Sequence, residues 1–273
     1  MWPYHSVERV LNVTRLYTAF CTQFEADYAF RGETHDFYEL VLVTEGCLGI
    51  TAGAETFVLE APAAVLHPPM EFHSLRAVGG TSPRITVFSF AAPQMPALSK
   101  RIFALNEEQI SIAARALSRI ERSMIMDDIS ITGVRPDKSC EAQCAVLALE
   151  ELLLSLSDSE TTTAQKESTA SGRNYRRALR VIEENLAASL TTEDLARLAH
   201  MSPSLLKKTF ARHAGVGVME YFRARKINAA IPLLREGLSV QEIATRLGFT
   251  NAGYFSTVFR RITGRTPSYY RSH

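Results

Sequence analysis

Cysteine is scarce in this sequence, and long hydrophobic runs are missing from it. The four cysteines are Cys21, Cys47, Cys140 and Cys144, and none of them has the Cys-x-x-Cys spacing of a zinc site. No apolar run approaches the roughly 18 residues that a membrane-spanning helix needs, and the first residues lack the features of a secretory signal. We therefore expect a cytoplasmic protein with reduced cysteines and no membrane association. Cys140 and Cys144, one helical turn apart, could act as a redox pair, although free cysteines are more commonly buried or unreactive.

A strong net charge is also absent, but the charges are unevenly distributed. The 30 Lys and Arg residues nearly balance the 29 Asp and Glu residues, for a formal net charge of +1. From Arg173 onward, 17 basic residues stand against 7 acidic ones, a balance of +10, which leaves −9 for residues 1–172. A basic segment joined to an acidic one is the pattern expected when one end of a chain meets a polyanion.

One internal segment, residues 158–173, has almost no large apolar side chain. Such a segment cannot offset the conformational entropy that is lost on ordering, so it predicts a flexible linker. The linker divides the chain into a domain over residues 1–157 and a domain over residues 174–273. With 273 residues, 46% of them hydrophobic, each domain has enough apolar material for its own core.

The first domain combines strands with helices. Residues 38–90 contain β-rich runs separated by Gly and Pro, which is typical of a small barrel or sandwich. Apolar residues at helical spacing predict two helices, over residues 104–126 and 141–157. Three leucines of the second helix could pack within their own domain, form a subunit interface, or do both: Leu149, Leu153 and Leu156.

The basic domain contains the same helical pattern twice. Residues 192–213 open with a capping Thr and an acidic first turn, and a second helix starts at Pro203. Residues 240–263 repeat this plan, with Gly248 at the end of the first helix. Two short helices joined so tightly cross steeply, as they do in a helix-turn-helix unit. A tandem pair of such units is stronger evidence than one alone.

An amphipathic helix of about 20 residues is expected between the two units. At 1.5 Å per residue it would be about 30 Å long, close to the roughly 34 Å of one turn of B-DNA. One chain could thus place the second helix of each unit in successive major grooves. Pro232 lies in this connecting helix, where it removes an amide hydrogen bond and could kink the helix.

Side chains that the helix cores do not use are the candidates for DNA contact. They are Ser204, Lys207 and Lys208 in the first unit, and Asn251, Ser256, Thr257, Arg260 and Arg261 in the second. Asn pairs with adenine and Arg with guanine through two hydrogen bonds each. Arg261, Arg265 and Arg271 are expected to contact phosphates, which supplies affinity without sequence information. The alternative for each of these residues is an ordinary solvated side chain.

Both domains resemble those of the AraC/XylS family of bacterial transcription regulators. Over residues 175–271 the segments DLARLAHMSPSLLKKTF, EYFRARKINAAIPLL, EIATRLGF and YFSTVFRRITGRTPSYYR appear in the family's order and spacing. THDFYELVLVTEG followed by PAAVLHPPMEFHSL looks like the cupin barrel of that family's effector-binding domain. The resemblance implies a multidomain α+β protein, with a cupin-like β-barrel and two flanking helices, then an all-α domain with two helix-turn-helix units joined by a long linker helix.

The resemblance also implies a function. A family member would be a dimeric, ligand-responsive regulator that binds double-stranded DNA and RNA polymerase, more often as an activator than as a repressor. Its barrel would hold a small molecule, such as a sugar or an aromatic metabolite. The expected pocket residues are the motif positions and the aromatic side chains near them: His35, Tyr38, Glu39, Phe72 and His73, with Phe30 and Phe37.

A metal site is a second possibility for the barrel. In cupin enzymes the positions of His35, Glu39 and His73 hold a transition metal together with one more histidine, where this chain has Glu33. Two imidazoles and two carboxylates suit several divalent ions. Barrels of regulators usually lose the full set, however, and the histidines could simply form hydrogen bonds in a pocket. We therefore expect no metal, no cofactor and no enzymatic activity.

Two alternative functions remain open. The first is a regulator of the same family that is controlled by a protein partner at its N-terminal domain. The second is a metal-dependent cupin enzyme that carries an incidental basic domain, although the tandem basic repeat argues against it.

Overall fold

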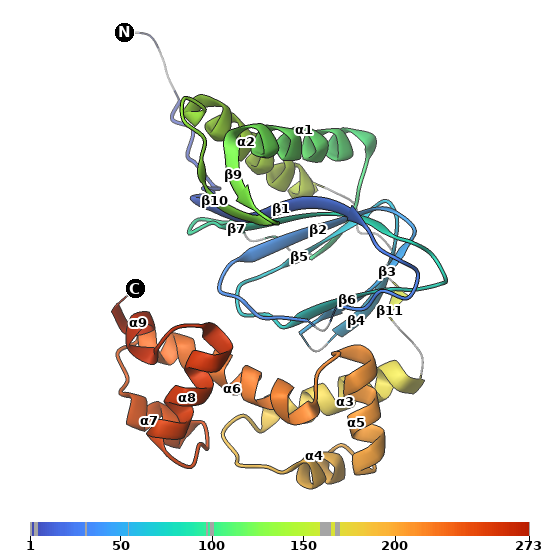
Figure 1. Cartoon of the computed structure of the whole chain (residues 1–273), viewed down its shortest axis with the longest axis vertical. Helices are drawn as coiled ribbons and strands as arrows, with labels where there is room; N and C mark the ends of the chain where they lie inside the picture. The colour runs from blue at the N-terminus through green and yellow to red at the C-terminus, as the bar shows by residue number, and fades with distance from the viewer. Residues whose placement is uncertain are drawn as a thin grey trace.

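A β-rich half is stacked on a helical half (Figure 1). The computed structural model describes residues 2, 5–30, 32–53, 55–96, 98, 101–158, 165–166 and 170–272. Within these residues, two antiparallel sheets form the β-rich half. The larger sheet has the order β8 (Ile102–Ala104), β5 (Ala63–His67), β2 (Tyr38–Glu45), β7 (Arg84–Ala91), β1 (Arg15–Gln23), β10 (Ser130–Val134), β9 (Met124–Asp127). The smaller sheet has the order β11 (Gln165–Lys166), β4 (Glu55–Glu60), β3 (Cys47–Ala52), β6 (His73–Ala77).

Strand β2 shows how the larger sheet separates two cores. Val41 and Val43 face the interior between the sheets and pack with residues of β3 and β4. Leu40 and Leu42, on the opposite face, pack against helices. Because both faces are covered, this strand is apolar along most of its length instead of alternating with polar residues.

Helices α1 (Glu107–Ser123) and α2 (Ser139–Ser155) cover the outer face of the larger sheet (Figure 1). A capping box formed by Asn106 and Gln109 fixes the start of α1. The three leucines Leu149, Leu153 and Leu156 are 0%, 0% and 1% exposed in the core beneath these helices, so they pack within their own domain. The outer face of α2 instead exposes Cys140, Cys144, Leu147 and Leu154.

Most of the predicted linker, residues 158–173, lies outside the described residues. Of its described part, Asp158 ends a 3₁₀ helix, Leu156–Asp158, and Gln165–Lys166 pairs with β4. Helix α3 (Ala170–Glu184) begins four residues before the predicted start of the second domain.

The helical half has the predicted tandem arrangement. The first unit consists of α4 (Thr192–Leu198) and α5 (Pro203–His213), and the second of α7 (Val240–Arg246) and α8 (Ala252–Thr263). The linker helix α6 (Val218–Arg235) connects them, and α9 (Pro267–Ser272) follows. Helix α6 continues through Pro232. The predicted fold class is confirmed: a cupin-like barrel with two flanking helices precedes an all-α domain with two helix-turn-helix units.

Each unit contributes to its own apolar core. Leu195, Leu206 and Phe210 are buried in the first core, whereas Leu198 is 41% exposed. Leu198 is the last residue of α4, and Ala199, its C-cap, takes the inward position. The described helices contain none that is long and apolar enough to cross a membrane.

Candidate functional site

Helix α5 presents a polar face opposite its core residues. The Ser202 side chain accepts a hydrogen bond from the backbone amide of Leu205 at 3.2 Å and so caps the helix. Leu206 and Phe210 are buried, while the three predicted DNA contacts of this unit are exposed: Ser204, Lys207 and Lys208. The helical period of 3.6 residues separates the two faces.

Helix α8 is organised in the same way. The Asn251 side chain accepts a hydrogen bond from the Tyr254 amide at 2.7 Å, and Gly264 ends the helix in the left-handed conformation. Four predicted DNA contacts of this unit are exposed, and one, Ser256, is half-buried; the exposed ones are Asn251, Thr257, Arg260 and Arg261. The Ser256 hydroxyl donates to the carbonyl of Ala252 at 2.8 Å, so it is turned back onto its own helix.

Two features of α8 were not predicted from the sequence. Tyr254 is 43% exposed on the same face as Asn251 and Thr257, and its spacing of three residues from each could have indicated this. Arg261 lines a cleft between the two halves of the molecule, together with Glu33, Phe72 and Glu220. The position of the barrel over α8 places Arg261 there.

Lys226 joins the two helix-turn-helix units. It lies in the middle of α6, is 4% exposed, and donates hydrogen bonds to the carbonyl of Ala188 at 2.7 Å and that of Leu247 at 2.8 Å. These carbonyls belong to the segment before α4 and to the end of α7. Burial lowers the pKa of Lys226 to about 8. The ammonium therefore holds together two segments that are 59 residues apart in the chain.

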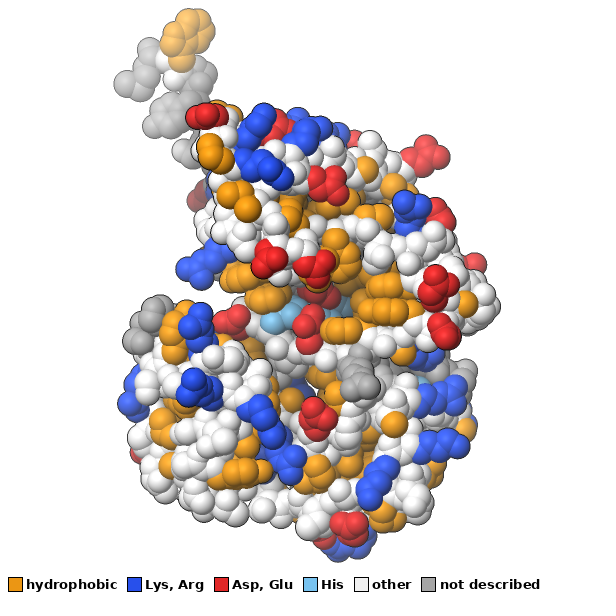
Figure 2. Space-filling model, in the orientation of Figure 1, with side chains coloured by type: hydrophobic (Ala, Val, Ile, Leu, Met, Phe, Trp, Pro, Cys, Tyr) orange, Lys and Arg blue, Asp and Glu red, His pale blue; other side chains and the backbone are white. Residues whose placement is uncertain are grey.

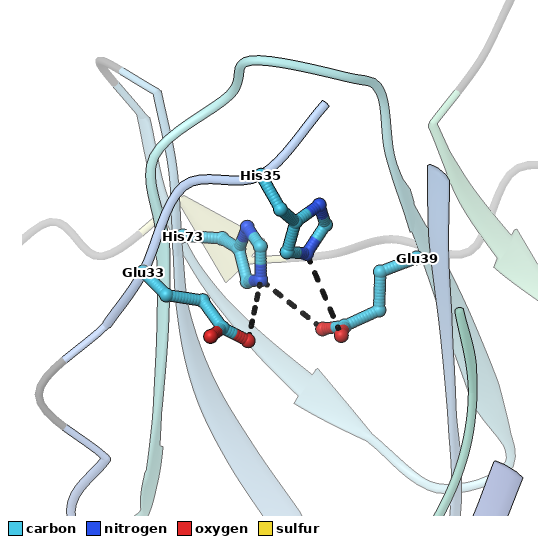
Figure 3. Close-up of side chains that lie close together, drawn as sticks. All are labelled: Glu33, His35, Glu39 and His73. Atoms are coloured by element: carbon cyan, nitrogen blue, oxygen red, sulfur yellow. Dashed lines mark ion pairs between the residues drawn. The ribbon is translucent and has the colours of Figure 1, made fainter. Parts of the chain in front are cut away.

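The barrel interior holds a compact cluster of His and Glu side chains (Figure 3). Glu39 comes from β2 and His73 from β6, while Glu33 and His35 lie in the segment before β2. His73 Nε2 is 3.1 Å from Glu39 Oε1 and 4.0 Å from Glu33 Oε1, and His35 Nε2 is 3.7 Å from Glu39 Oε2. One ligand atom from each residue lies within 4.8 Å of the others.

Backbone carbonyls fix the orientation of both imidazoles. Nδ1 of His35 is 2.9 Å from the Phe37 carbonyl, and Nδ1 of His73 is 3.1 Å from the Glu71 carbonyl. A carbonyl only accepts hydrogen bonds, so each Nδ1 carries a proton and each Nε2 is directed at Glu39. Neither Nε2 makes a hydrogen bond of good geometry.

The Glu39 carboxylate and a protonated His73 stabilise each other's charge. Burial raises the pKa of the Glu39 carboxyl, but the contacts with His35 and His73 outweigh it and bring the pKa well below its ordinary value. Burial lowers the pKa of His73, but the Glu39 carboxylate outweighs it and the pKa is raised. Glu39 is therefore a carboxylate, and a positive charge is favoured beside it.

A second network lies behind this cluster. His67 Nδ1 is 3.0 Å from Glu71 Oε2, and Arg101 forms an ion pair with the same carboxylate. The His67 ring stacks on His73 with centroids 4.3 Å apart. Burial and the neighbouring His73 lower the pKa of His67 to about 4, so this ring is neutral at pH 7.

Of the predicted pocket residues, the structure brings together His35, Glu39 and His73 but not Tyr38 or Phe72. Tyr38 precedes Glu39 in β2 and therefore points to the other face, where it packs with the helix-side core. Phe72 packs into the core of the helical half, with its ring 4.7 Å from that of Tyr221.

A cavity of about 360 Å³ adjoins the cluster. Its walls are mainly aromatic and aliphatic, and they also carry two carboxylates of the cluster and three hydroxyl side chains; they include Phe20, Phe24, Tyr28, Phe30, Phe37, Glu33 and Glu39. Histidine and acidic side chains are visible in the hollow between the two halves, and Lys and Arg side chains are scattered over the helical half (Figure 2). Phe20, Phe24 and Tyr28 were missed because they come from β1 and the segment after it, outside the motif stretch.

The barrel also contacts the first helix-turn-helix unit directly. The hydroxyls of Thr51 in β3 and Ser74 in β6 donate to the His213 carbonyl, at 3.1 Å and 2.9 Å. His213 is the last residue of α5. Ser74 follows His73 in β6, so the two side chains point to opposite faces of the strand. Strand β6 therefore connects the His and Glu cluster with the end of α5.

Comparison with known proteins adds two family matches. Residues 19–130 match the model of the AraC-like ligand binding domain, and residues 195–273 match that of a helix-turn-helix domain. The first match covers strands β2 and β6 of the cluster, and the second covers both helix-turn-helix units from the middle of α4 onward.

Two curated relatives each match about a third of this chain. The uncharacterized HTH-type transcriptional regulator YpdC of Escherichia coli is 39% identical over 90 residues, 33% of this chain and 32% of that protein. The XylDLEGF operon transcriptional activator of Pseudomonas putida is 36% identical over 99 residues, 35% of this chain and 31% of that protein. The chain thus spans about a third of the length of these curated relatives. A crystal structure of ToxT from Vibrio cholerae aligns over 94% of this chain and 97% of its own, with 12% identity and a TM-score of 0.38.

Proposed function

Since this chain belongs to the AraC/XylS family of transcription regulators, we propose that it reads two successive major grooves of DNA and responds to a small molecule in its barrel. The observation that carries the proposal is the matched pair of units, each with an exposed polar face on its second helix. The linker helix between them has 18 residues, about 27 Å at 1.5 Å per residue. That length is compatible with one turn of B-DNA.

The exposed side chains of α5 and α8 have distinct roles in this proposal. Arg260 reads guanine, and Asn251 reads adenine with its NH2 group and with the second lone pair of Oδ1, whose first lone pair caps α8. Lys207 and Lys208 bind phosphates and nearby base edges. The hydroxyl of Ser204 contacts the DNA directly, whereas the hydroxyls of Ser256 and Thr257 donate to their own helix and act as acceptors. The exposed Arg261 binds a phosphate.

The barrel cavity is the proposed effector site. Its aromatic walls and its carboxylates suit a ligand with an apolar side and a polar side, such as an aromatic metabolite or a sugar. Ligand binding at the cluster would reach the DNA-binding half through β6, because Ser74 holds the end of α5. Such a ligand regulates DNA binding only if it binds the two arrangements of the halves with different affinity.

We extend the proposal to the assembly. The exposed Leu147 and Leu154 of α2 would contribute to a homodimer interface, and the dimer would activate transcription in the cytoplasm through RNA polymerase. The barrel would act as a receptor and not as an enzyme, as expected if the regulatory relatives reflect its role.

Selection of bound sequences from a random pool of duplexes by the full chain tests the function. We expect two clusters of preferred bases, with centres about 10 base pairs apart. The affinity for the selected duplex should fall steeply with added salt. A pool without enrichment, or a selected site with one cluster, would contradict the proposal.

A further inference from the structure

We propose that Glu33, His35, Glu39 and His73 form a binding site for one divalent transition-metal ion. This inference revises the expectation of no metal, and it does not depend on the proposed DNA-binding function. Four ligand atoms, two imidazole nitrogens and two carboxylate oxygens, lie within 4.8 Å of one another. Mixed nitrogen and oxygen ligands suit Mn²⁺, Fe²⁺, Co²⁺, Ni²⁺ or Zn²⁺, whereas Mg²⁺ and Ca²⁺ prefer oxygen alone.

The orientation of the two imidazoles is the first argument. Each Nδ1 is occupied by a backbone carbonyl, so each Nε2 offers either a lone pair or a second proton toward Glu39. Both Nε2 atoms are buried and lack a well-aligned hydrogen bond. Two lone pairs that face one carboxylate repel it unless a cation lies between them. Backbone carbonyls behind the rings are a usual way to aim imidazoles at a metal.

The balance of charge is the second argument. The cluster combines two carboxylates with two imidazoles, and a divalent ion would make the site neutral with both rings uncharged. A single extra proton on His73 faces both Glu39, at 3.1 Å, and Glu33, at 4.0 Å, and balances only one of the two negative charges. The metal would replace that proton and contact all four side chains at once.

The size and access of the site are the third argument. With bonds of about 2.1 Å, ligand atoms on opposite sides of an ion lie about 4.2 Å apart. The observed 4.8 Å needs only a small inward movement. Glu33, whose side chain is 50% exposed, is free to make it. The cavity of about 360 Å³ reaches both carboxylates and offers an entry path with room for water or another ligand.

Cobalt binding tests the proposal. Full-length protein without a histidine tag would be stripped with a chelator and titrated with Co²⁺, whose visible absorption bands report on its ligands. We expect saturable bands at one ion per chain, which Zn²⁺ removes and Mg²⁺ does not. The ion should also raise the midpoint of thermal unfolding, because it binds the folded chain.

Matched variants assign the binding to this cluster. Glu33→Gln keeps the shape of a half-exposed side chain and removes one ligand charge, so we expect Co²⁺ affinity to fall by about 10-fold or more. His73→Gln should abolish the bands, and its metal-free unfolding midpoint reports whether the barrel stays folded. His200→Asn is the control, because His200 lies in the other half at a positive φ that Asn tolerates.

Three results would overturn the proposal. These are wild-type protein without cobalt bands, a Glu33→Gln variant with wild-type affinity, and loss of binding in His200→Asn. None of them involves DNA, so failure here is distinguishable from failure of the proposed regulatory function.

Discussion

Arg260 is the single side chain from which we expect the clearest effect on DNA sequence preference. It is exposed on α8, on the face opposite the buried Phe255 and Phe259, and Arg reads guanine through two hydrogen bonds. We expect Arg260→Ala to weaken binding to the selected duplex by about 1–3 kcal/mol and to relax the preference at one base pair. Arg265→Ala is the comparison, because Arg265 follows the helix end and should contact only phosphate. It should weaken binding to all sequences alike. It should also reduce by about 1 the slope of the logarithm of the affinity against the logarithm of the salt concentration. Titrations on matched and mismatched duplexes would show both effects.

Lys226 gives a prediction about stability. Lys226→Met would leave the buried Leu247 carbonyl and the partly buried Ala188 carbonyl without their donor, at a cost of about 1–3 kcal/mol for the buried one and less for the other. The free energy of unfolding in urea should fall accordingly, whereas the exposed Lys207→Met should change it by less than about 0.5 kcal/mol. An unchanged stability in Lys226→Met would mean that water replaces the ammonium.

The lowered pKa of Lys226 adds a dependence on pH. The folded chain releases this proton at about pH 8, against 10.5 for an ordinary lysine, so the unfolded state binds more protons between these values. Its contribution to the free energy of unfolding should therefore rise with pH across that window. The stability difference between wild type and Lys226→Met, measured by urea unfolding at both ends of the window, should grow with pH. A constant difference would contradict this assignment.

Among the turns, Gly248 ends α7 in a conformation that few other residues tolerate. Its φ is +62°, and a Cβ there would overlap the Ala187 carbonyl oxygen. Gly264 ends α8 with φ +71°, but no atom lies within 4 Å of its Cβ position. We expect Gly264→Ala to cost roughly 1 kcal/mol of backbone strain, and Gly248→Ala to cost clearly more because backbone has to move. Urea unfolding of both variants compares them, and equal losses would show that the close approach is relieved cheaply.

The helices and turns of the second domain were predictable because their signals are local. Capping residues, Pro203 and Gly248 place the two units over residues 192–213 and 240–263, where α4, α5, α7 and α8 are found. The same local rules fail for side chains whose environment depends on distant segments. Tyr38 is adjacent to Glu39 in the motif, yet the alternation along a strand sends it to the other core.

The way in which the two halves pack against each other could not be predicted from the sequence. Nothing in the pattern around Phe72 indicates that its ring packs in the core of the other half, beside Tyr221. The hydrogen bonds of Thr51 and Ser74 to the end of α5 depend equally on how the halves dock. Complementarity of two folded surfaces decides these contacts, and a single sequence carries no local signal for it.

Phe72 therefore offers a test of how the halves are coupled. It comes from the segment just before β6, is 4% exposed, and packs against Tyr221 of α6. Phe72→Ala should remove an anchor between the halves, since loss of a buried Phe costs about 3–5 kcal/mol. By calorimetry we expect one unfolding transition in wild type and two in the variant.

Freeing the halves should also affect DNA binding. If the docked arrangement restrains the helix-turn-helix units, Phe72→Ala should change affinity for the selected duplex without changing which bases are preferred, because no residue of α5 or α8 is altered. Phe24→Ala is the matched control, since Phe24 lines the barrel cavity and does not belong to the helical core. A variant that still unfolds in one transition, or a Phe24→Ala variant that separates the halves equally, would show that the coupling does not depend on the Phe72 contact.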